Sequence, residues 1–424
     1  MSKQKTLTIQ QVIDLAVQHH NEGRLPQAEI IYQQILQSNP NHPIALHLLG
    51  VIALQMGEND KAVNLIKRAL DVEPDLVEAH NNIGIALREL GRLEEAGMRF
   101  CTALKLKTDY AAAHYNLGML QLLEGDFTRG WANYAWRRKM PKYHFRKNDY
   151  KKPFWDGSKL KGRTIFVYPE QGLGDSIQFV RYLPTLASLG ARVLLEVPSE
   201  LLRLFQNMKS PIEIIKPNDP IPEFDYHTSL LDLPRLLNTS LETIPSYKSY
   251  LQAPSDLTNI WADRLGPRTA FRLGIVWAGN PKHKHDRDRS IEATLMRPLV
   301  EITGISIFSL QVGRGGEASE IFGDKVVDIA PILNDFADTA AALSNLDLIV
   351  TVDTAVAHLA GALGCRTRTL LPFIPDWRWL LERNDSPWYP SMQLLRQPQR
   401  NDWQTILDQV HTELTTIANR DKNV

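Results

Sequence analysis

The feature that most constrains the fold is a 34-residue repeat in the first third of the chain. Small residues recur at this spacing in several registers. They are Ala16, Gly50, Gly84 and Gly118 in one register, Gly23, Gly57, Gly91 and Gly125 in a second, and Ala28, Ala62, Ala96 and Gly130 in a third. Repetition at such a short period is typical of stacked copies of one supersecondary unit, because one copy cannot bury its apolar face alone.

Each repeat carries what a pair of packed helices needs. The small residues let two helices approach closely, glycine suits the turn between them, and Pro40 and Pro74 end the second helix of a repeat. This pattern resembles the tetratricopeptide repeat (TPR). The third repeat has Thr108 at the proline position, and the fourth has Gly130 and Arg137 in place of alanines. We therefore expect about four TPR repeats over residues 1–142, the last of them a cap.

Arrays of this kind bind extended peptides or partner proteins along a concave face. Asn82 and Asn116 occupy one position in successive repeats, where their amides could hold a peptide backbone. Two other interpretations stay open. An exposed helix amide is usually only solvated, and the array could instead act as a spacer or as a surface for oligomerisation.

Charge and cysteine content narrow the class of function. The chain has 48 basic and 48 acidic side chains, which argues against nucleic acid or a membrane surface as a partner. Cys101 and Cys365 provide no disulfide framework and no multi-cysteine metal site. The N-terminus has no apolar leader, and the most apolar segment, 346–364, is interrupted by Asp353 and His358. We therefore expect no membrane span and a cytoplasmic location.

The period changes after residue 142. Residues 143–160 are basic, aromatic and aperiodic, and are interpreted as a linker that packs partly through Phe154 and Trp155. Beyond the linker, short β-rich runs alternate with helical patterns, as in a parallel α/β sheet. The runs are TIFVY, ARVLLEV and PIEIIK in residues 161–265, and FRLGIVWAG, ISIFSLQVG, KVVDIA, LDLIVTV and RTRTLLPF in residues 266–424. We expect two doubly wound, Rossmann-type α/β domains whose strand ends face one another across a cleft.

The first polar motif follows the first of these strands. Gly172 and Gly174 open a helix in the sequence QGLGD, where glycine allows close backbone approach and a helix N-terminus favours an anion. Asp175 stands at the start of that helix and has two interpretations. It is either an ordinary helix cap or a general base for an acceptor hydroxyl. Gln178, one turn later, joins the candidate ligand contacts.

The second motif is the strand end WAGNP with the loop after it. Its dense cations suit a diphosphate, which arginine and lysine neutralise well. The candidate contacts here and at the end of the following strand are Trp277, Asn280, Lys282, Arg289, Ser290 and Gln311. Two alternatives stay open. One is a metal site at His283 and His285, which lacks the usual ligand pattern, and we expect no metal. The other is a loop that is merely solvated.

The third motif stands where the strand LDLIVTV gives way to a helix of small residues. Asp353, Thr354 and His358 lie at this junction, and the free amides of a helix start point the same way as the strand end. We expect these three side chains to contact phosphate or ribose. A lone histidine would more often be a satisfied core residue, but three polar residues at one junction favour a site.

Together, GLGD and DTAVAHLAGALG resemble the inverting GT-B glycosyltransferases of the ADP-heptose:lipopolysaccharide heptosyltransferase family. The blocks EQGLGD, VWAGNP, VDTAVAHLAGALG and DWRWLLERNDSPWYP, in this order, are similar to those of bacterial TPR-containing glycosyltransferase-like proteins. The resemblance implies that residues 161–265 form the acceptor side and residues 266–424 the nucleotide-sugar donor side. It also implies metal-independent hexosyl or heptosyl transfer with Asp175 as base, and no cofactor besides the nucleotide diphosphate sugar that is consumed.

Several departures from the family pattern keep alternatives open. The loop WAGNPKHKHDRDRS differs from the lysine-bearing loop of heptosyltransferases, and Arg366 and Arg368 stand where an apolar strand is expected, either reaching the cleft or lying on an exposed edge. The aromatic segment DWRWLLERNDSPWYP could line a sugar site, but core packing is favoured. The rival functions are a TPR scaffold with a degenerate, non-catalytic nucleotide-binding module and a GT-B-fold epimerase.

Overall fold

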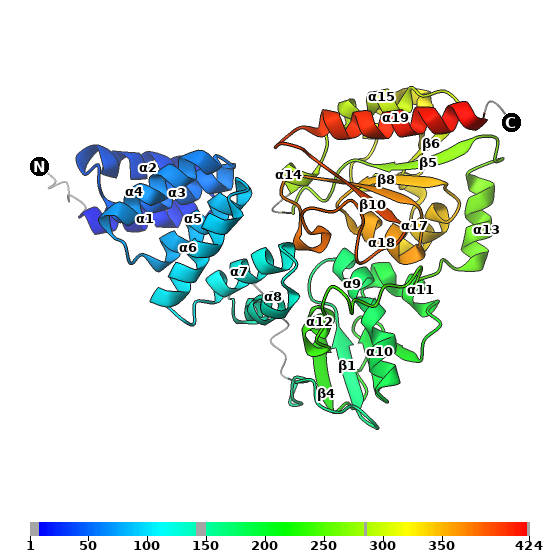
Figure 1. The fold of residues 1–424 in the computed structure, drawn as a ribbon, viewed down its shortest axis with the longest axis horizontal. Coiled ribbons are helices and arrows are strands. Elements are labelled where there is room, and N and C mark those ends of the chain that lie inside the picture. The colour runs from blue at the N-terminus through cyan, green and yellow to red at the C-terminus, as the bar shows by residue number, and fades with distance from the viewer. Residues whose placement is uncertain (1–7, 141–149, 284–285, 422–424) are drawn as a thin grey trace, which may run out of the picture. The chain divides into compact units, whose positions relative to one another are not determined.

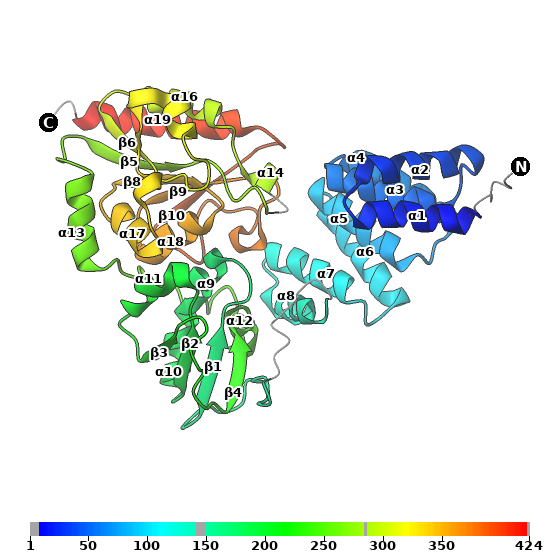
Figure 2. The same cartoon turned by 180° about the vertical axis from the view of Figure 1, so that it is seen from behind.

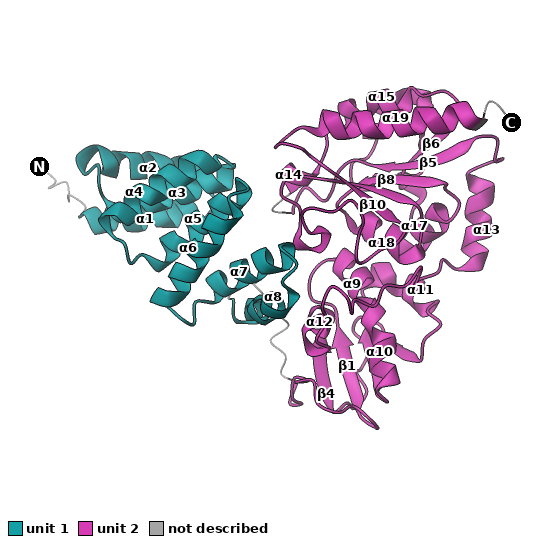
Figure 3. Cartoon of the chain, in the orientation of Figure 1, with its two compact units in different colours: residues 1–144 teal, residues 145–424 magenta. Residues whose placement is uncertain are grey.

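The computed structural model describes residues 8–140, 150–283 and 286–421. The chain divides into two compact units, residues 1–144 and 145–424 (Figure 3). Each unit has its own hydrophobic core, and each is described by itself. The predicted linker, 143–160, begins in residues outside the described ranges. Its later part does pack, because the Trp155 side chain is 1% exposed and Phe154 bridges to His227.

The first unit is a series of antiparallel helix pairs (Figures 1 and 2). The helices are α1 (Ile9–Asn21), α2 (Leu25–Ser38), α3 (Pro43–Met56), α4 (Asn59–Val72), α5 (Val77–Glu89), α6 (Leu93–Leu106), α7 (Ala111–Leu123) and α8 (Phe127–Tyr134). Consecutive helices pack on one another, and a 3-10 turn, Ala135–Lys139, follows α8. The predicted helical repeat array is therefore confirmed.

The repeated small residues have the steric role that the sequence indicates. A Cβ atom on Gly50 would lie 2.5 Å from the Ile66 side chain, and one on Gly84 would lie 2.6 Å from the Phe100 ring. Glycine at these positions is what admits the second helix of the pair. The turn register works through backbone conformation instead, because Gly57 and its equivalents have φ near 80°.

The second unit begins with a four-stranded parallel sheet in the order β3-β2-β1-β4. The strands are β1 (Thr164–Tyr168), β2 (Arg192–Glu196), β3 (Ile212–Ile215) and β4 (Tyr226–Ser229), and the helices are α9 (Leu173–Phe179), α10 (Leu183–Ser188), α11 (Leu202–Gln206) and α12 (Leu233–Leu236). The β-rich runs of the sequence predict the first three strands but not β4. Its sequence, YHTS, has no aliphatic residue, although three of its four residues are buried.

A six-stranded parallel sheet follows, in the order β10-β9-β8-β5-β6-β7. Its strands are β5 (Phe271–Val276), β6 (Ile305–Ser309), β7 (Val327–Asp328), β8 (Leu348–Val352), β9 (Thr367–Leu371) and β10 (Met392–Arg396). The chain progresses outward from β5 in one direction and then from β8 in the other. This reversal is the switch point of a doubly wound sheet, where ligand sites form at the carboxyl ends of the strands.

Helices cover both faces of the six-stranded sheet (Figures 1 and 2). α15 (Arg297–Val300), α16 (Glu317–Phe322) and α19 (Trp403–Asp421) lie on one face, and α17 (Phe336–Leu343) and α18 (Ala355–Leu363) lie on the other. The short α14 (Asp286–Arg289) lies in the loop after β5, and α13 (Ser255–Arg264) packs on α17. The fold class is thus a helical array followed by α/β structure, and its assignment to a GT-B pair stays a prediction.

Of the two arginines, Arg368 lies within β9 and is buried, which corrects its expected placement in a cleft or on an exposed edge, whereas Arg366 precedes the strand and is exposed. β9 is an interior strand between β8 and β10. Arg366 and Arg368 both donate to the Glu413 carboxylate of α19, at 2.7 and 2.6 Å. They hold the last helix on the sheet, so they are no sign of a degenerate module. Within the described ranges, no helix is both long and apolar enough to cross a membrane.

Candidate functional site

The candidate site lies where α9 meets the start of α18, at the carboxyl ends of β1 and β8. Gly174 makes this approach possible. A Cβ atom there would lie 2.8 Å from His358 Cδ2 and 3.4 Å from the Ala355 Cα atom. The absence of a side chain at Gly174 is therefore explained by helix packing. Gly172 is the exposed N-cap residue of α9.

Asp175 is engaged through both carboxylate oxygens. Its Oδ2 accepts a hydrogen bond of 2.8 Å from the backbone N–H of Gly172, so it caps α9. Its Oδ1 accepts from Nη2 of Arg378, which belongs to the loop after β9. The Asp175 side chain retains 15% exposure. The structure thus shows the cap interpretation directly, while the role of Asp175 as a base remains a prediction.

Arg378 links both halves of the second unit at this point. Its Nε donates to Gln178 Oε1 at 2.7 Å, its Nη1 donates to Asp376 Oδ1 at 2.7 Å, and its Nη2 donates to Asp175. The guanidinium also lies 4.3 Å from the ring centroid of Trp377. A planar fork with fixed donors suits this bridging of several acceptors better than lysine would. Gln178 is therefore buried as a partner of Arg378.

Arg378 and Asp376 were not among the predicted site residues. Both lie in the segment DWRWLL, whose aromatic residues alone were candidates for a site. The available signal was a charged pair directly after the strand RTRTLLPF, since polar residues at strand ends are candidates for a site. The aromatic residues themselves are buried packing residues, as favoured: Trp377, Trp379, Trp388 and Tyr389 are all at most 1% exposed.

Asp353 lies directly after β8, and Arg289 fixes its backbone. Arg289 Nη1 donates to the carbonyl oxygen of Asp353 at 3.0 Å. Removal from water raises the pKa of the Asp353 carboxyl to about 6, and the neighbouring Asp376 charge adds to this effect. Arg289 and Arg378 oppose it. Carboxyl groups with a pKa near neutral pH are typical of functional sites, and this one stands at a strand end.

Thr354 and His358 are held at the start of α18. Thr354 is the N-cap residue, and its hydroxyl accepts from the Val356 N–H at 3.3 Å. His358 is 6% exposed, lies 2.8 Å from the Tyr389 hydroxyl through Nδ1, and stacks on Trp379. Burial and the nearby arginine charges hold the pKa of His358 well below its usual range, so the ring is neutral.

The loop after β5 is built from the predicted residues, but several of them serve the backbone. Gln311 Oε1 accepts from the N–H groups of Trp277 and Ala278, and its Nε2 donates to the Ala278 carbonyl. Ser290 joins the Gly279 N–H to Asp286. Trp277 is 0% exposed. These contacts fix the conformation of the strand end rather than present polar atoms to a ligand.

The other predicted contacts of this loop, Asn280 and Lys282, are exposed. Asn280 Oδ1 accepts from the Lys282 N–H at 3.0 Å, so this amide shapes the turn of the loop itself. His283 is exposed as well, and His285 falls outside the described ranges. In the part of the chain that the structure describes, no three His, Cys, Asp or Glu side chains are grouped as metal ligands.

The two asparagines of the array lie in the first unit and hydrogen bond to their neighbours. Asn116 Nδ2 donates to Asn81 Oδ1 at 2.8 Å, and Asn82 Nδ2 lies 3.0 Å from His47 Nε2. Asn116 is buried, at 9% exposure. These amides join successive repeats. Their predicted contact with a peptide stays a prediction.

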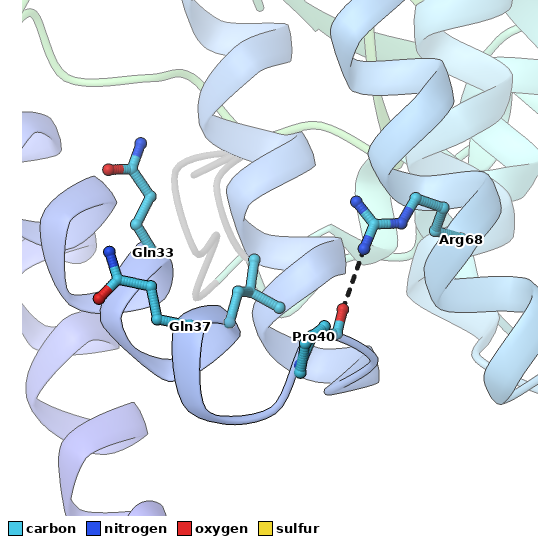
Figure 4. Close-up of a pocket in the computed structure, with 5 residues that line it drawn as sticks. Gln33, Gln37, Pro40 and Arg68 are labelled. Atoms are coloured by element: carbon cyan, nitrogen blue, oxygen red, sulfur yellow. Dashed lines mark hydrogen bonds between the residues drawn. The ribbon is translucent and has the colours of Figure 1, made fainter.

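A surface hollow lies elsewhere in the first unit, beside α2 and α4 (Figure 4). It is lined by Gln33, Leu36, Gln37, Pro40 and Arg68. Arg68 Nη2 donates to the Pro40 carbonyl at 2.9 Å, which ties the end of one repeat to the next. The hollow contains none of the predicted site residues.

The comparisons with known proteins support the repeat array. The family model described as tetratricopeptide repeat matches residues 20–83. Protein FlbA of Caulobacter vibrioides is 26% identical over 295 residues, which cover 62% of this chain and 48% of that protein. The chain thus spans about half the length of this relative. The name of this relative describes no activity.

Two solved structures are similar to part of the chain. MamA from Desulfovibrio magneticus RS-1 is 18% identical, and the matched region covers 31% of this chain and 77% of the MamA chain, with a TM-score of 0.28. A thermophilic TPR protein of Thermus thermophilus is 23% identical and covers 31% of this chain and 74% of its own, with a TM-score of 0.29.

Proposed function

We propose that the second unit is an inverting glycosyltransferase, which binds a nucleotide diphosphate sugar at the ends of β5 and β8, and that the TPR array recruits its acceptor. TPR repeats are protein-interaction modules, so the array favours a protein or peptide as the acceptor or as its carrier. The observation that carries the proposal is the meeting of Asp175, Arg378 and the start of α18 at one point. Asp175 belongs to the half of the second unit that contains the four-stranded sheet, and Arg378 and α18 belong to the half that contains the six-stranded sheet.

The proposed reaction uses these groups in sequence. Asp175 accepts the proton of an acceptor hydroxyl, whose oxygen attacks the anomeric carbon from the face opposite the leaving group. The bond between that carbon and the diphosphate oxygen breaks, and its electron pair leaves with the diphosphate. Arg289 and the positive end of the α18 helix dipole are suited to stabilise this anion. His358, held neutral, is suited to hydrogen bond with a ribose or sugar hydroxyl.

The proposal is tested first by ligand binding. ADP, GDP, UDP and CDP, each free and as a sugar conjugate, are added to the full chain in a thermal-shift series. A ligand that binds only the folded protein stabilises it by about 2.7 kcal/mol at 100 times its Kd. We expect one nucleotide class to raise the melting temperature of the native protein. The rise on adding the same nucleotide to the Arg289→Ala variant, measured against that variant without ligand, should be smaller. Arg383→Ala, which removes an exposed ion pair with Asp385, is the matched control.

Transfer is then measured by mass spectrometry of the acceptor, or by hydrolysis of the sugar conjugate. Asp175→Asn should abolish turnover and retain donor binding. Turnover that is unchanged in this variant contradicts the role of Asp175. If none of the nucleotides raises the melting temperature and no sugar is released, the protein is not a glycosyltransferase.

One observation favours a second candidate, a TPR scaffold whose α/β module binds a nucleotide without catalysis. Both oxygens of Asp175 already have partners, so an acceptor hydroxyl has to compete with the Arg378 ion pair. Nucleotide binding without transfer or hydrolysis would support this candidate. Since Cys101 and Cys365 are both free thiols, either function suits a reducing compartment, and we propose a cytoplasmic one.

A further inference from the structure

We propose that Arg378 is the positioning residue for Asp175. We also propose that its guanidinium stabilises the Asp175 carboxylate before transfer and the leaving diphosphate once Asp175 has accepted the acceptor proton. The inference rests on the proposed function and deepens it.

The first step is the placement of the guanidinium. Arg378 is 8% exposed in its side chain, and its Nη2, Nη1 and Nε donate to Asp175, Asp376 and Gln178. Because Gln178 lies one turn after Asp175 on α9, Arg378 contacts α9 at two successive points. Two points of contact fix both the direction of the Asp175 carboxylate and the distance of α9 from the loop that holds Arg378.

The second step is the balance of charge. Arg378 shares its positive charge between Asp175 and Asp376, and its neighbour Trp379 stacks on His358 with ring centroids 5.3 Å apart. His358 belongs to the start of α18, where the diphosphate is proposed to leave. The guanidinium is therefore close to the base as well as to the proposed position of the leaving group.

The third step is the change during transfer. When the acceptor hydroxyl gives its proton to Asp175, the carboxylate becomes neutral, and the new bond forms between the acceptor oxygen and the anomeric carbon. The bond from that carbon to the diphosphate oxygen breaks, and the diphosphate carries away the electron pair as negative charge. Arg378 loses one anionic partner and gains another. Stabilisation of this kind is stronger in the transition state than in the ground state, which is what raises a rate.

The test is a double-mutant cycle on binding of ADP, GDP, UDP and CDP, measured by calorimetry on the full chain. Asp175→Asn imitates the protonated base, since its amide carries no charge. It should bind the preferred diphosphate about tenfold more tightly than the native protein, because hydrogen bonds to a charged group have roughly this worth. Arg378→Gln should bind it about tenfold more weakly.

The double variant separates this inference from simple repulsion between Asp175 and the ligand. The gain from Asp175→Asn should vanish when Arg378 is already Gln. A gain of the same size in both backgrounds overturns the inference, because repulsion alone then explains it. If Arg378→Gln does not fold, Arg378→Lys takes its place. Its flexible ammonium cannot hold three acceptors, so the gain should shrink, and an undiminished gain overturns the inference.

Failure of the proposed function has a different result. If none of the four diphosphates binds the native protein, both the donor site and this inference are overturned. If a diphosphate binds and the cycle shows no coupling, only the inference is overturned. The control cycle is Arg383→Gln with Asp385→Asn, a bidentate pair in the same segment that should leave diphosphate binding unchanged.

Discussion

At the scale of single residues, the candidate site depends on an amino acid with no side chain. Gly174 lies against His358 and Ala355, so any Cβ atom there must displace α18 or α9. We expect Gly174→Ala to destabilise the second unit by about 1–3 kcal/mol, the usual cost of overpacking. Urea unfolding measures this change. Gly315→Ala is the control, because no atom lies within 4 Å of its Cβ position, and a similar loss there would contradict the packing argument.

A second prediction at this scale concerns pH and Asp353. Its pKa is raised to about 6 in the folded protein, so the folded state binds this proton more tightly than the unfolded state. The stability from this group is complete below about pH 4 and is lost as the pH rises through about 6. Asp353→Asn stays neutral and avoids the loss.

The stability of Asp353→Asn relative to the native protein should therefore rise between about pH 4.5 and pH 7.5, by on the order of 1–3 kcal/mol. Urea unfolding at several pH values measures the difference. A difference that is flat across this range would show that the carboxyl is not held neutral.

At the scale of elements, β9 and α19 are tied by charge. Arg368 is 8% exposed, and its guanidinium shares the Glu413 carboxylate with Arg366. Glu413→Gln would leave a buried cation without its counter-charge, so we expect a loss of about 3 kcal/mol in the free energy of unfolding. Glu301→Gln breaks an exposed pair with Lys325 and should cost less than about 1 kcal/mol. Equal effects in the two variants would mean that the Glu413 contacts are not buried in solution.

Elements also differ in how well their sequences specify them. β8 is recognisable because LIVTV is almost wholly aliphatic and fully buried. β4 is not, because YHTS becomes a strand only by pairing with β1, from Ile165–Tyr226 to Tyr168–Ser229. Its burial depends on residues that are distant in the sequence, including Phe154, which bridges to His227. Short polar strands of this kind carry no periodic signal.

At the scale of the whole molecule, the chain consists of two compact units with separate cores, and we expect each to fold alone. Residues 1–140 and 150–424, prepared separately, should each give a cooperative thermal transition, and their circular dichroism spectra should sum to that of the full chain. A fragment that stays unfolded until the other is added would contradict this independence.

A fall in pH should have opposite effects on the stability of the two units, through His47 in the first unit and Asp353 in the second. Burial lowers the pKa of His47 in the array to about 4, so its contribution to stability is present above about pH 6.5 and is lost as the pH falls toward 4. His47→Gln should reduce the acid sensitivity of the first unit's transition and leave that of the second unit unchanged. Calorimetry of the full chain at about pH 7 and about pH 5 measures both transitions.

The sequence alone determined what depends on neighbouring residues. The 34-residue period set the helix pairs and their turns, and the β-rich runs set most of the strands, because steric fit and alternation are local properties. Asp175, Asp353, Thr354 and His358 were found as polar residues at strand and helix ends. Only the tertiary structure decided which charges meet. Arg378 reaches Asp175 across 203 residues, and burial nearby raises the pKa of Asp353 and lowers the pKa of His358, which no local pattern encodes.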